Sequence, residues 1–162
     1  KWEIITQNGD CIRVQSPVRT HKGSLTAQRT ITLETGERFV YDRVEVFGPA
    51  DMLAKTDIGI GLKKFDGGKV VVNKQLGYLI SYGSGYVPDT GQVGLAIKFK
   101  PEDIRDVVKR EHGIYAVIRS GQEAGYIKAN QKLSAWWSRD HTVQNPEIMI
   151  ETLEKISLPD GL

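Results

Sequence analysis

The stretch LTAQRTITLETGERFVYDRVEVFG at residues 25–48 predicts two antiparallel strands joined by a tight turn. In its first part, apolar and polar residues alternate with the period of two that marks a strand with unlike faces. One row of this strand is apolar apart from a single arginine: Ala27, Arg29, Ile31 and Leu33. The segment ETGE at residues 34–37 predicts a hairpin turn, because its glycine can adopt a positive φ.

The second strand, at residues 38–47, has two rows of very different character. One row holds three valines and is broken by Asp42. The other row mixes aromatic and charged residues: Phe39, Tyr41, Arg43, Glu45 and Phe47. Such a row makes a poor core but a good platform for a sugar. Two alternatives stay open, an exposed face of amphipathic side chains and a face covered by another part of the protein.

The rest of the chain repeats short apolar runs separated by turn signals about every ten residues, which is typical of an all-β sandwich. Further strands are expected at residues 11–21, 57–62, 69–73, 77–82, 93–99, 114–119, 125–128 and 133–137. Two short helices are expected, one from Pro101 to about residue 109 and one capped by Asn145 with Pro146 in its first turn. The second helix is expected to dock on a sheet through Ile148, Ile150, Leu153 and Ile156. We therefore predict one antiparallel β-sandwich unit over residues 1–162. Several strands are polar on both faces, which indicates half of a larger sandwich.

Bulk composition excludes several classes of function. The net charge of the 162 residues is only +2, and acids interrupt the lysines and arginines everywhere, which argues against a nucleic-acid binder. No run approaches the roughly 18 apolar residues that cross a membrane. The lone Cys11 is expected to be a small packed residue. The chain opens directly in a strand without a signal peptide, so we expect the C-terminal part of a larger protein.

The order of several segments resembles a family of large bacterial proteins of unassigned function that occur in polysaccharide-utilisation gene clusters, often beside unsaturated glucuronyl hydrolases. The pieces that carry the resemblance most specifically are GERFVYDRVEVFG and SAWWSRD, and HGIYAVIR lies between them. The chain departs from the family pattern after TDIGIGL, where Lys63 and Lys64 stand in place of a histidine. The resemblance implies half of a galactose-mutarotase-like supersandwich, a periplasmic or extracellular location, and a missing N-terminal segment as partner. It also implies acidic, uronate-containing oligosaccharides as substrates.

Elimination on a uronic acid would require three chemical roles. A cation must stabilise the carboxylate, a base must remove the C5 proton, and an acid must protonate the leaving oxygen. We predict His112 and Tyr82 as the acid–base pair, because histidine titrates near neutrality and a tyrosine hydroxyl can give or take a proton. Arg43, Lys63 and Lys64 are candidates for the substrate carboxylate.

Three further residues are predicted to contact the sugar. Tyr86 lies in the glycine-rich segment GYLISYGSGYVPDTG, and His141 follows an aromatic pair. Trp136 is assigned to the ligand side and Trp137 to the core, because neighbours in a strand point to opposite faces. No metal motif is present, but a divalent cation held by His112, His141 and a carboxylate stays open.

Three functions therefore compete. The first is a lyase or dehydratase that acts on uronic-acid oligosaccharides. The second is a carbohydrate-binding sandwich without chemistry. The third is a structural half that supports another polypeptide carrying the site.

Overall fold

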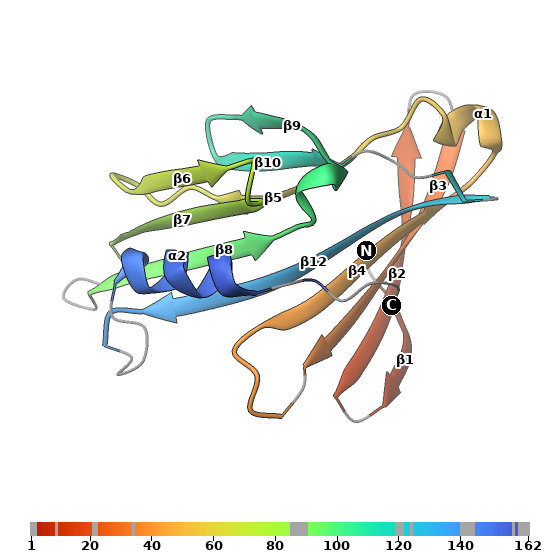
Figure 1. Cartoon of the computed structure of the whole chain (residues 1–162). Helices are drawn as coiled ribbons and strands as arrows, with labels where there is room; N and C mark the ends of the chain where they lie inside the picture. Colours follow the sequence, from red (N-terminus) through yellow and green to blue (C-terminus); the bar gives the residue numbers. More distant parts are fainter. Residues whose placement is uncertain are drawn as a thin grey trace.

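The computed structural model describes residues 3–8, 10–20, 23–33, 35–84, 91–118, 122–123, 125–139, 145–156 and 158. Within them the chain is an all-β protein with two antiparallel sheets and short helices, which confirms the predicted fold class. Figure 1 shows a long, twisted large sheet with a small sheet over one end of it.

The large sheet has nine strands in the order β1-β2-β3-β4-β12-β8-β7-β6, with the short β11 paired to β12. Its strands are β1 Glu3–Asn8, β2 Cys11–Thr20, β3 Gly23–Leu33, β4 Val40–Phe47, β6 Lys69–Asn73, β7 Tyr78–Ser84, β8 Gln92–Lys98, β11 Gln122–Glu123 and β12 Tyr126–Trp137. The small sheet has the order β5-β10-β9, with β5 Ile58–Lys63, β10 Gly113–Ile118 and β9 Ile104–Lys109. The helices are α1 Ala50–Leu53, the 3-10 helix η1 Pro101–Asp103, and α2 Pro146–Lys155.

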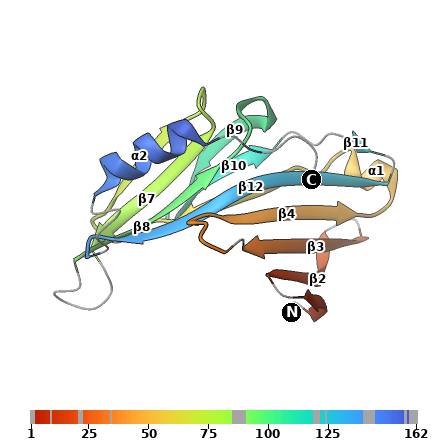
Figure 2. The same ribbon diagram turned by 60° about the horizontal axis from the view of Figure 1, so that its bottom comes forward.

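Two apolar clusters hold one half of the large sheet between two layers. On one face, Leu79 and Ile97 pack against Ile114, Ala116 and Ile118 of the small sheet. On the other face, a second cluster lies beneath α2 and joins Tyr78, Ile80, Ala96, Trp136, Met149 and Leu153. Figure 2 shows α2 over β7 and β8, while β2, β3 and β4 extend beyond both covering layers.

β12 is the strand that links the two halves. Residues Tyr126 to Leu133 pair with β4, and residues Lys132 to Trp137 pair with β8. The sequence had suggested two separate strands here, at 125–128 and 133–137. The polar residues between them continue the strand, because Gln131 is buried and bonded to a carboxylate on β4.

The first predicted helix is wrong. Only Pro101–Asp103 is helical, and the following residues form the strand β9. The segment IRDVVK carries three β-branched residues, which favour a strand once β10 offers a partner.

The second helix is confirmed, but its docking face is shifted. The Asn145 side chain accepts a hydrogen bond from the Ile148 backbone amide, 3.0 Å away, as the predicted cap requires. Pro146, Met149 and Leu153 are the buried residues of the helix. Ile150 and Ile156 pack partly against the cluster, whereas Ile148 is exposed.

Candidate functional site

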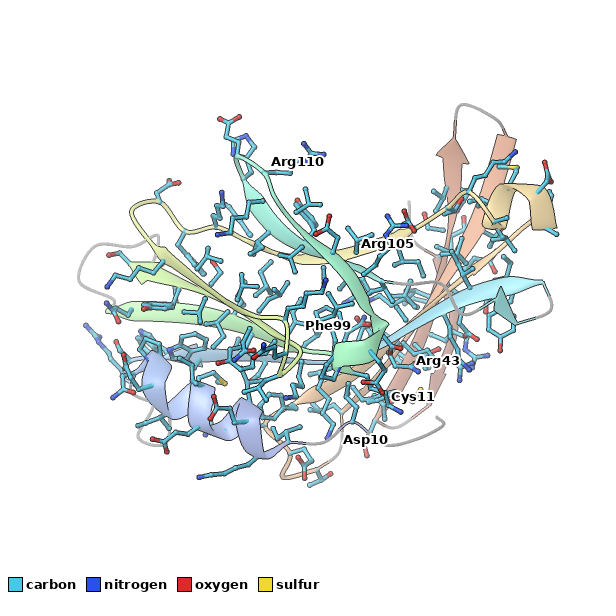
Figure 3. All side chains as sticks on the ribbon, turned by 45° about the horizontal axis from the view of Figure 1, so that its top comes forward. Asp10, Cys11, Arg43, Phe99, Arg105 and Arg110 are labelled. Carbon is cyan, nitrogen blue, oxygen red and sulfur yellow. The ribbon has the colours of Figure 1, made fainter. Side chains whose placement is uncertain are left out.

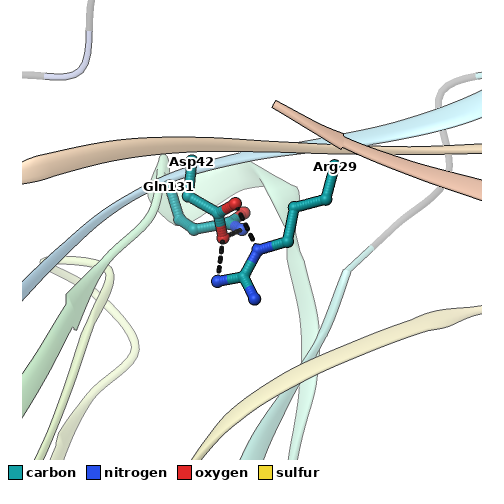
Figure 4. A network of polar contacts seen from close by, with 3 residues as sticks. All are labelled: Arg29, Asp42 and Gln131. Carbon is teal, nitrogen blue, oxygen red and sulfur yellow. Dashed lines mark hydrogen bonds and ion pairs between the residues drawn. The ribbon is translucent and has the colours of Figure 1, made fainter. Parts of the chain in front are cut away.

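A buried ion pair occupies the apolar face of the large sheet where two charged residues interrupt it. Asp42 is 1% exposed and accepts hydrogen bonds from Arg29 Nε at 2.7 Å and Nη2 at 3.1 Å, and from Gln131 Nε2 at 2.5 Å (Figure 4). Arg29 lies opposite Val44 and Asp42 lies opposite Ile31, so the two charges are diagonal neighbours on β3 and β4. Arg29 interrupts the apolar row of β3 and Asp42 interrupts that of β4, and the two interruptions are explained by their bond to each other.

The face predicted as a sugar platform is built as its alternation suggested, but its two charged residues are paired with each other. Arg43 Nη2 is 2.5 Å from Glu45 Oε1, and the Phe47 ring lies 5.4 Å from the ring of Tyr126. Burial raises the pKa of Tyr41, and the Arg43 charge opposes that rise. The Tyr41 hydroxyl, Arg43 Nε and Asn130 Oδ1 are buried without a hydrogen-bond partner.

The predicted roles of the two tryptophans are reversed. Trp136 is 5% exposed and packs beneath α2, with its ring directly over Gly94, where a Cβ atom would overlap it. Trp137 is 42% exposed, and the Arg139 guanidinium lies 5.5 Å from its ring centre. Parity alone could not distinguish the faces, because α2 covers the face of Trp136 whereas the opposite face is exposed at Ala135 and Trp137.

The predicted catalytic pair is not brought together. Tyr82 belongs to the cluster beneath α2, with its ring 6.1 Å from that of Trp136. His112 lies in the turn between β9 and β10 of the small sheet, which covers the opposite face of the large sheet, and its side chain is 84% exposed. Tyr86 and His141 lie outside the described residues.

Three predicted residues are brought to the same end of the small sheet by backbone pairing. The pairing of β5 with β10 places Lys63 opposite Gly113, and the Lys64 backbone amide donates to the His112 carbonyl at 3.0 Å. The Lys64 ammonium donates to the Arg110 carbonyl at 2.5 Å, and the Arg110 amide donates to the Gly113 carbonyl at 2.8 Å. Figure 3 shows Arg110 at the outer end of this hairpin, well away from Arg43 on the large sheet.

We call this group the basic end. Its members are Lys63, Lys64, Lys109, Arg110 and His112. Glu111 is the acid within the turn, and its carboxylate lies 3.7 Å from His112 Nε2. Lys109 was not predicted because residues 101–109 are expected as a helix, and Arg110 was not predicted although it follows that range directly. Tyr115, two residues beyond Gly113, was missed as well, although the alternation of GIYAVI predicts that it points away from the core.

The basic end can bind an anion. An ammonium group has three donors, so Lys64 keeps two N–H groups beyond its bond to Arg110. A guanidinium matches a carboxylate with two parallel hydrogen bonds. Among the described residues, no three histidine, cysteine, aspartate or glutamate side chains group as a metal site requires.

No helix in the described part of the chain is both long and apolar enough to span a membrane. Comparison of the chain with models of known protein families, with curated proteins and with solved structures finds no match.

Proposed function

We propose that the chain binds an acidic carbohydrate at the basic end of the small sheet. The observation that carries the proposal is the convergence of cations from separate segments, 63–64 and 109–112, at one end of three paired strands. The whole chain has a net charge of only +2, so this concentration of positive charge is local. A local positive field raises the concentration of anionic ligands at the surface that carries it. The sequence resemblance described above supplies the uronic acid as the carboxylate-bearing sugar.

Binding fits the geometry better than elimination does. His112 is almost fully exposed to water, and Tyr82 lies on the other side of the large sheet. General acid–base catalysis needs both groups within hydrogen-bonding reach of one substrate. The described residues therefore support recognition of the acidic sugar and not the predicted acid–base pair.

Calorimetric titration with a defined oligouronate tests the proposal. The chain should bind the oligouronate but not a neutral oligosaccharide of matched length, and the affinity should fall as salt is added. The triple variant Lys63→Gln, Lys64→Gln, Arg110→Gln should weaken binding by about tenfold or more, since each lost charge-assisted contact counts. If the neutral oligosaccharide binds as tightly as the oligouronate, the proposal is wrong.

A matched control exists for the lysine substitutions. Lys74 Nζ donates to the carbonyl of Arg105 at 2.7 Å, much as Lys64 Nζ donates to that of Arg110. Arg105 lies near the start of β9, whereas the basic end is at the end of that strand. Lys74→Gln should leave oligouronate binding unchanged. The same mixtures should be followed for the ultraviolet absorbance of a C4–C5 double bond. Absorbance that grows with wild type and not with His112→Ala would favour a lyase or dehydratase in place of a binding protein.

A second candidate, the structural half of a larger sandwich, is favoured by one specific observation. On the face of the large sheet that packs on the small sheet, Leu25 and Ala27 of β3 are buried. Farther out on β1–β3, Ile4, Val18 and Leu33 are 64%, 38% and 48% exposed on the same face. Apolar patches of this kind mark contact surfaces. Light scattering after size exclusion should show self-association of the chain, and Ile4→Lys with Leu33→Lys should reduce it. A monodisperse unmodified chain would contradict this candidate.

A further inference from the structure

Tyr115 lies across two glycines on the outer face of the small sheet. It is 38% exposed and pairs with Gly61 of β5, while Gly113 precedes it by two residues on β10. A Cβ atom at Gly61 would stand 2.5 Å from Tyr115 Cδ1, and one at Gly113 would stand 2.7 Å from the Tyr115 hydroxyl oxygen. The ring therefore occupies the space that a side chain at Gly113 would fill, and it shares with the Ile114 carbonyl group the space of one at Gly61.

Backbone conformation does not explain these two glycines. Neither belongs to the described glycines with positive φ, which are Gly23, Gly36, Gly67, Gly77, Gly91 and Gly125. A glycine inside a strand weakens it, and often marks a place where something else approaches the backbone closely. At Gly113 the approaching group is the tyrosine ring, which lies against the sheet, whereas strand side chains ordinarily stand out from it. At Gly61 the ring approaches as well, but the Ile114 carbonyl oxygen lies closer still.

The hydroxyl end of the ring points toward the basic end. The hydroxyl lies above Gly113, which follows His112 in the chain and pairs with Lys63. Lys63 and Gly61 are two residues apart on β5, so the Lys63 side chain leaves the sheet on the same face as the ring. The Arg110 amide is bonded to the Gly113 carbonyl, which brings that residue to the same edge.

We propose that Tyr115 is the stacking residue of the site, and that the ligand is a pyranose ring bearing a carboxylate. This inference rests on the proposed function and goes further, because it separates a uronate sugar from other small anions. The C–H groups of one pyranose face pack on the exposed side of the aromatic ring. The carboxylate at the edge of the same sugar then meets Lys63, Lys64 and Arg110.

Four variants test the stacking role, each measured by calorimetry with the oligouronate. Tyr115→Leu should weaken binding about tenfold, and Tyr115→Phe should stay within about threefold of wild type, since the ring is kept. Gly113→Ala should weaken binding about fivefold, because the three atoms nearest its methyl group all belong to the Tyr115 side chain and the ring is pushed away. Gly59→Ala on the neighbouring strand β5 is the control, because a Cβ atom there meets nothing within 4 Å.

A second titrant, tricarballylate, separates stacking from simple anion binding. Its carboxylates can meet the cations but it has no sugar ring, so Tyr115→Leu should leave its binding unchanged. If Tyr115→Leu binds the oligouronate as tightly as wild type while the triple lysine–arginine variant loses it, the stacking role fails and the proposed function stands. If wild type binds no oligouronate, both fail. Circular dichroism and thermal unfolding of every variant confirm that the fold is retained.

Discussion

The two halves of the large sheet share an alternating sequence pattern but differ in what covers them. In the half formed by β6, β7, β8 and the end of β12, Leu79, Ile80 and Ile97 are at most 1% exposed between α2 and the small sheet. In the half formed by β1–β4, Leu25, Ala27 and Val46 are also buried, but Ile4 and Leu33 remain open on the same sheet face. The difference teaches that alternation specifies which side chains share a face and leaves open whether anything packs on that face.

The largest expected effect comes from shortening one apolar side chain in each half of the sheet. Leu79→Ala should lower the free energy of unfolding by about 2–5 kcal/mol, because it leaves a cavity between two packed layers. Leu33→Ala, at a residue 48% exposed, should cost less than about 1 kcal/mol. Urea unfolding monitored by circular dichroism measures both. Equal losses would mean that the open half is buried in solution.

The buried ion pair at the border of the halves should give the next largest effect. Asp42→Ala removes the carboxylate from Arg29 and Gln131 and should cost about 1–3 kcal/mol, less than for a fully buried pair because the Arg29 side chain is 37% exposed. The double variant Arg29→Leu, Asp42→Leu should recover most of that loss, within about 1 kcal/mol of wild type. A double variant as unstable as Asp42→Ala would show that the pair holds the halves together through more than its charges.

A smaller effect is expected at the cap of α2, which covers one half only. Asn145→Ala removes the acceptor for the Ile148 amide and should cost about 1 kcal/mol. Asn145→Asp keeps an acceptor and should stay near wild type. The measurement is the midpoint of thermal unfolding. An effect of Asn145→Ala below about 0.3 kcal/mol would indicate that α2 docks without its cap.

The smallest expected effect is a pH-dependent change in stability at Asp103, the last residue of η1. Burial raises the pKa of Asp103 above its ordinary value of 3.8, and Glu102 adds to the rise. The folded chain therefore holds this proton to higher pH than the unfolded chain, so the stabilisation is complete below pH 3.8 and is lost as pH rises through the folded pKa.

The neutral variant reports that loss directly. Asp103→Asn should match wild type near pH 3 and exceed its melting temperature by on the order of 1 °C at pH 7. Asp66→Asn, in the exposed turn between β5 and β6, is the control for the loss of one negative charge. A variant that is less stable than wild type at pH 7 would contradict the assignment.

Much of the fold could be predicted from the sequence, because strand alternation and turn residues are local signals. The hairpin of β3 and β4 and the capped α2 were predicted near their observed positions. The pairing of Arg29 with Asp42 could not be, although both breaks in the apolar rows were visible, because only the register of β3 on β4 makes them neighbours. The helix predicted at 101–109 failed because β10, its partner, is what selects a strand there.

The candidate site shows the same boundary between local and non-local information. Lys63, Lys64 and His112 were each predicted for their chemistry, and the pairing of β5 with β10 brings them together. Tyr115 was not predicted as a site residue, because it lies against two glycines, one of which is on another strand. Of the two glycines in the alternating segment IGIGL, Gly61 faces this large neighbour and Gly59 faces none, so the sequence alone does not locate it.

The split pairing of β12 has a consequence for cooperativity. Its first eight residues bond to β4 and its last six to β8, and the two sets overlap only at Lys132 and Leu133. Among the described residues, the backbone hydrogen bonds of the large sheet therefore pass from one half to the other through this single strand. The amides of β12 should exchange with heavy water more slowly than those of β1 or β6 at the sheet edges, because releasing them requires one half to come apart from the other.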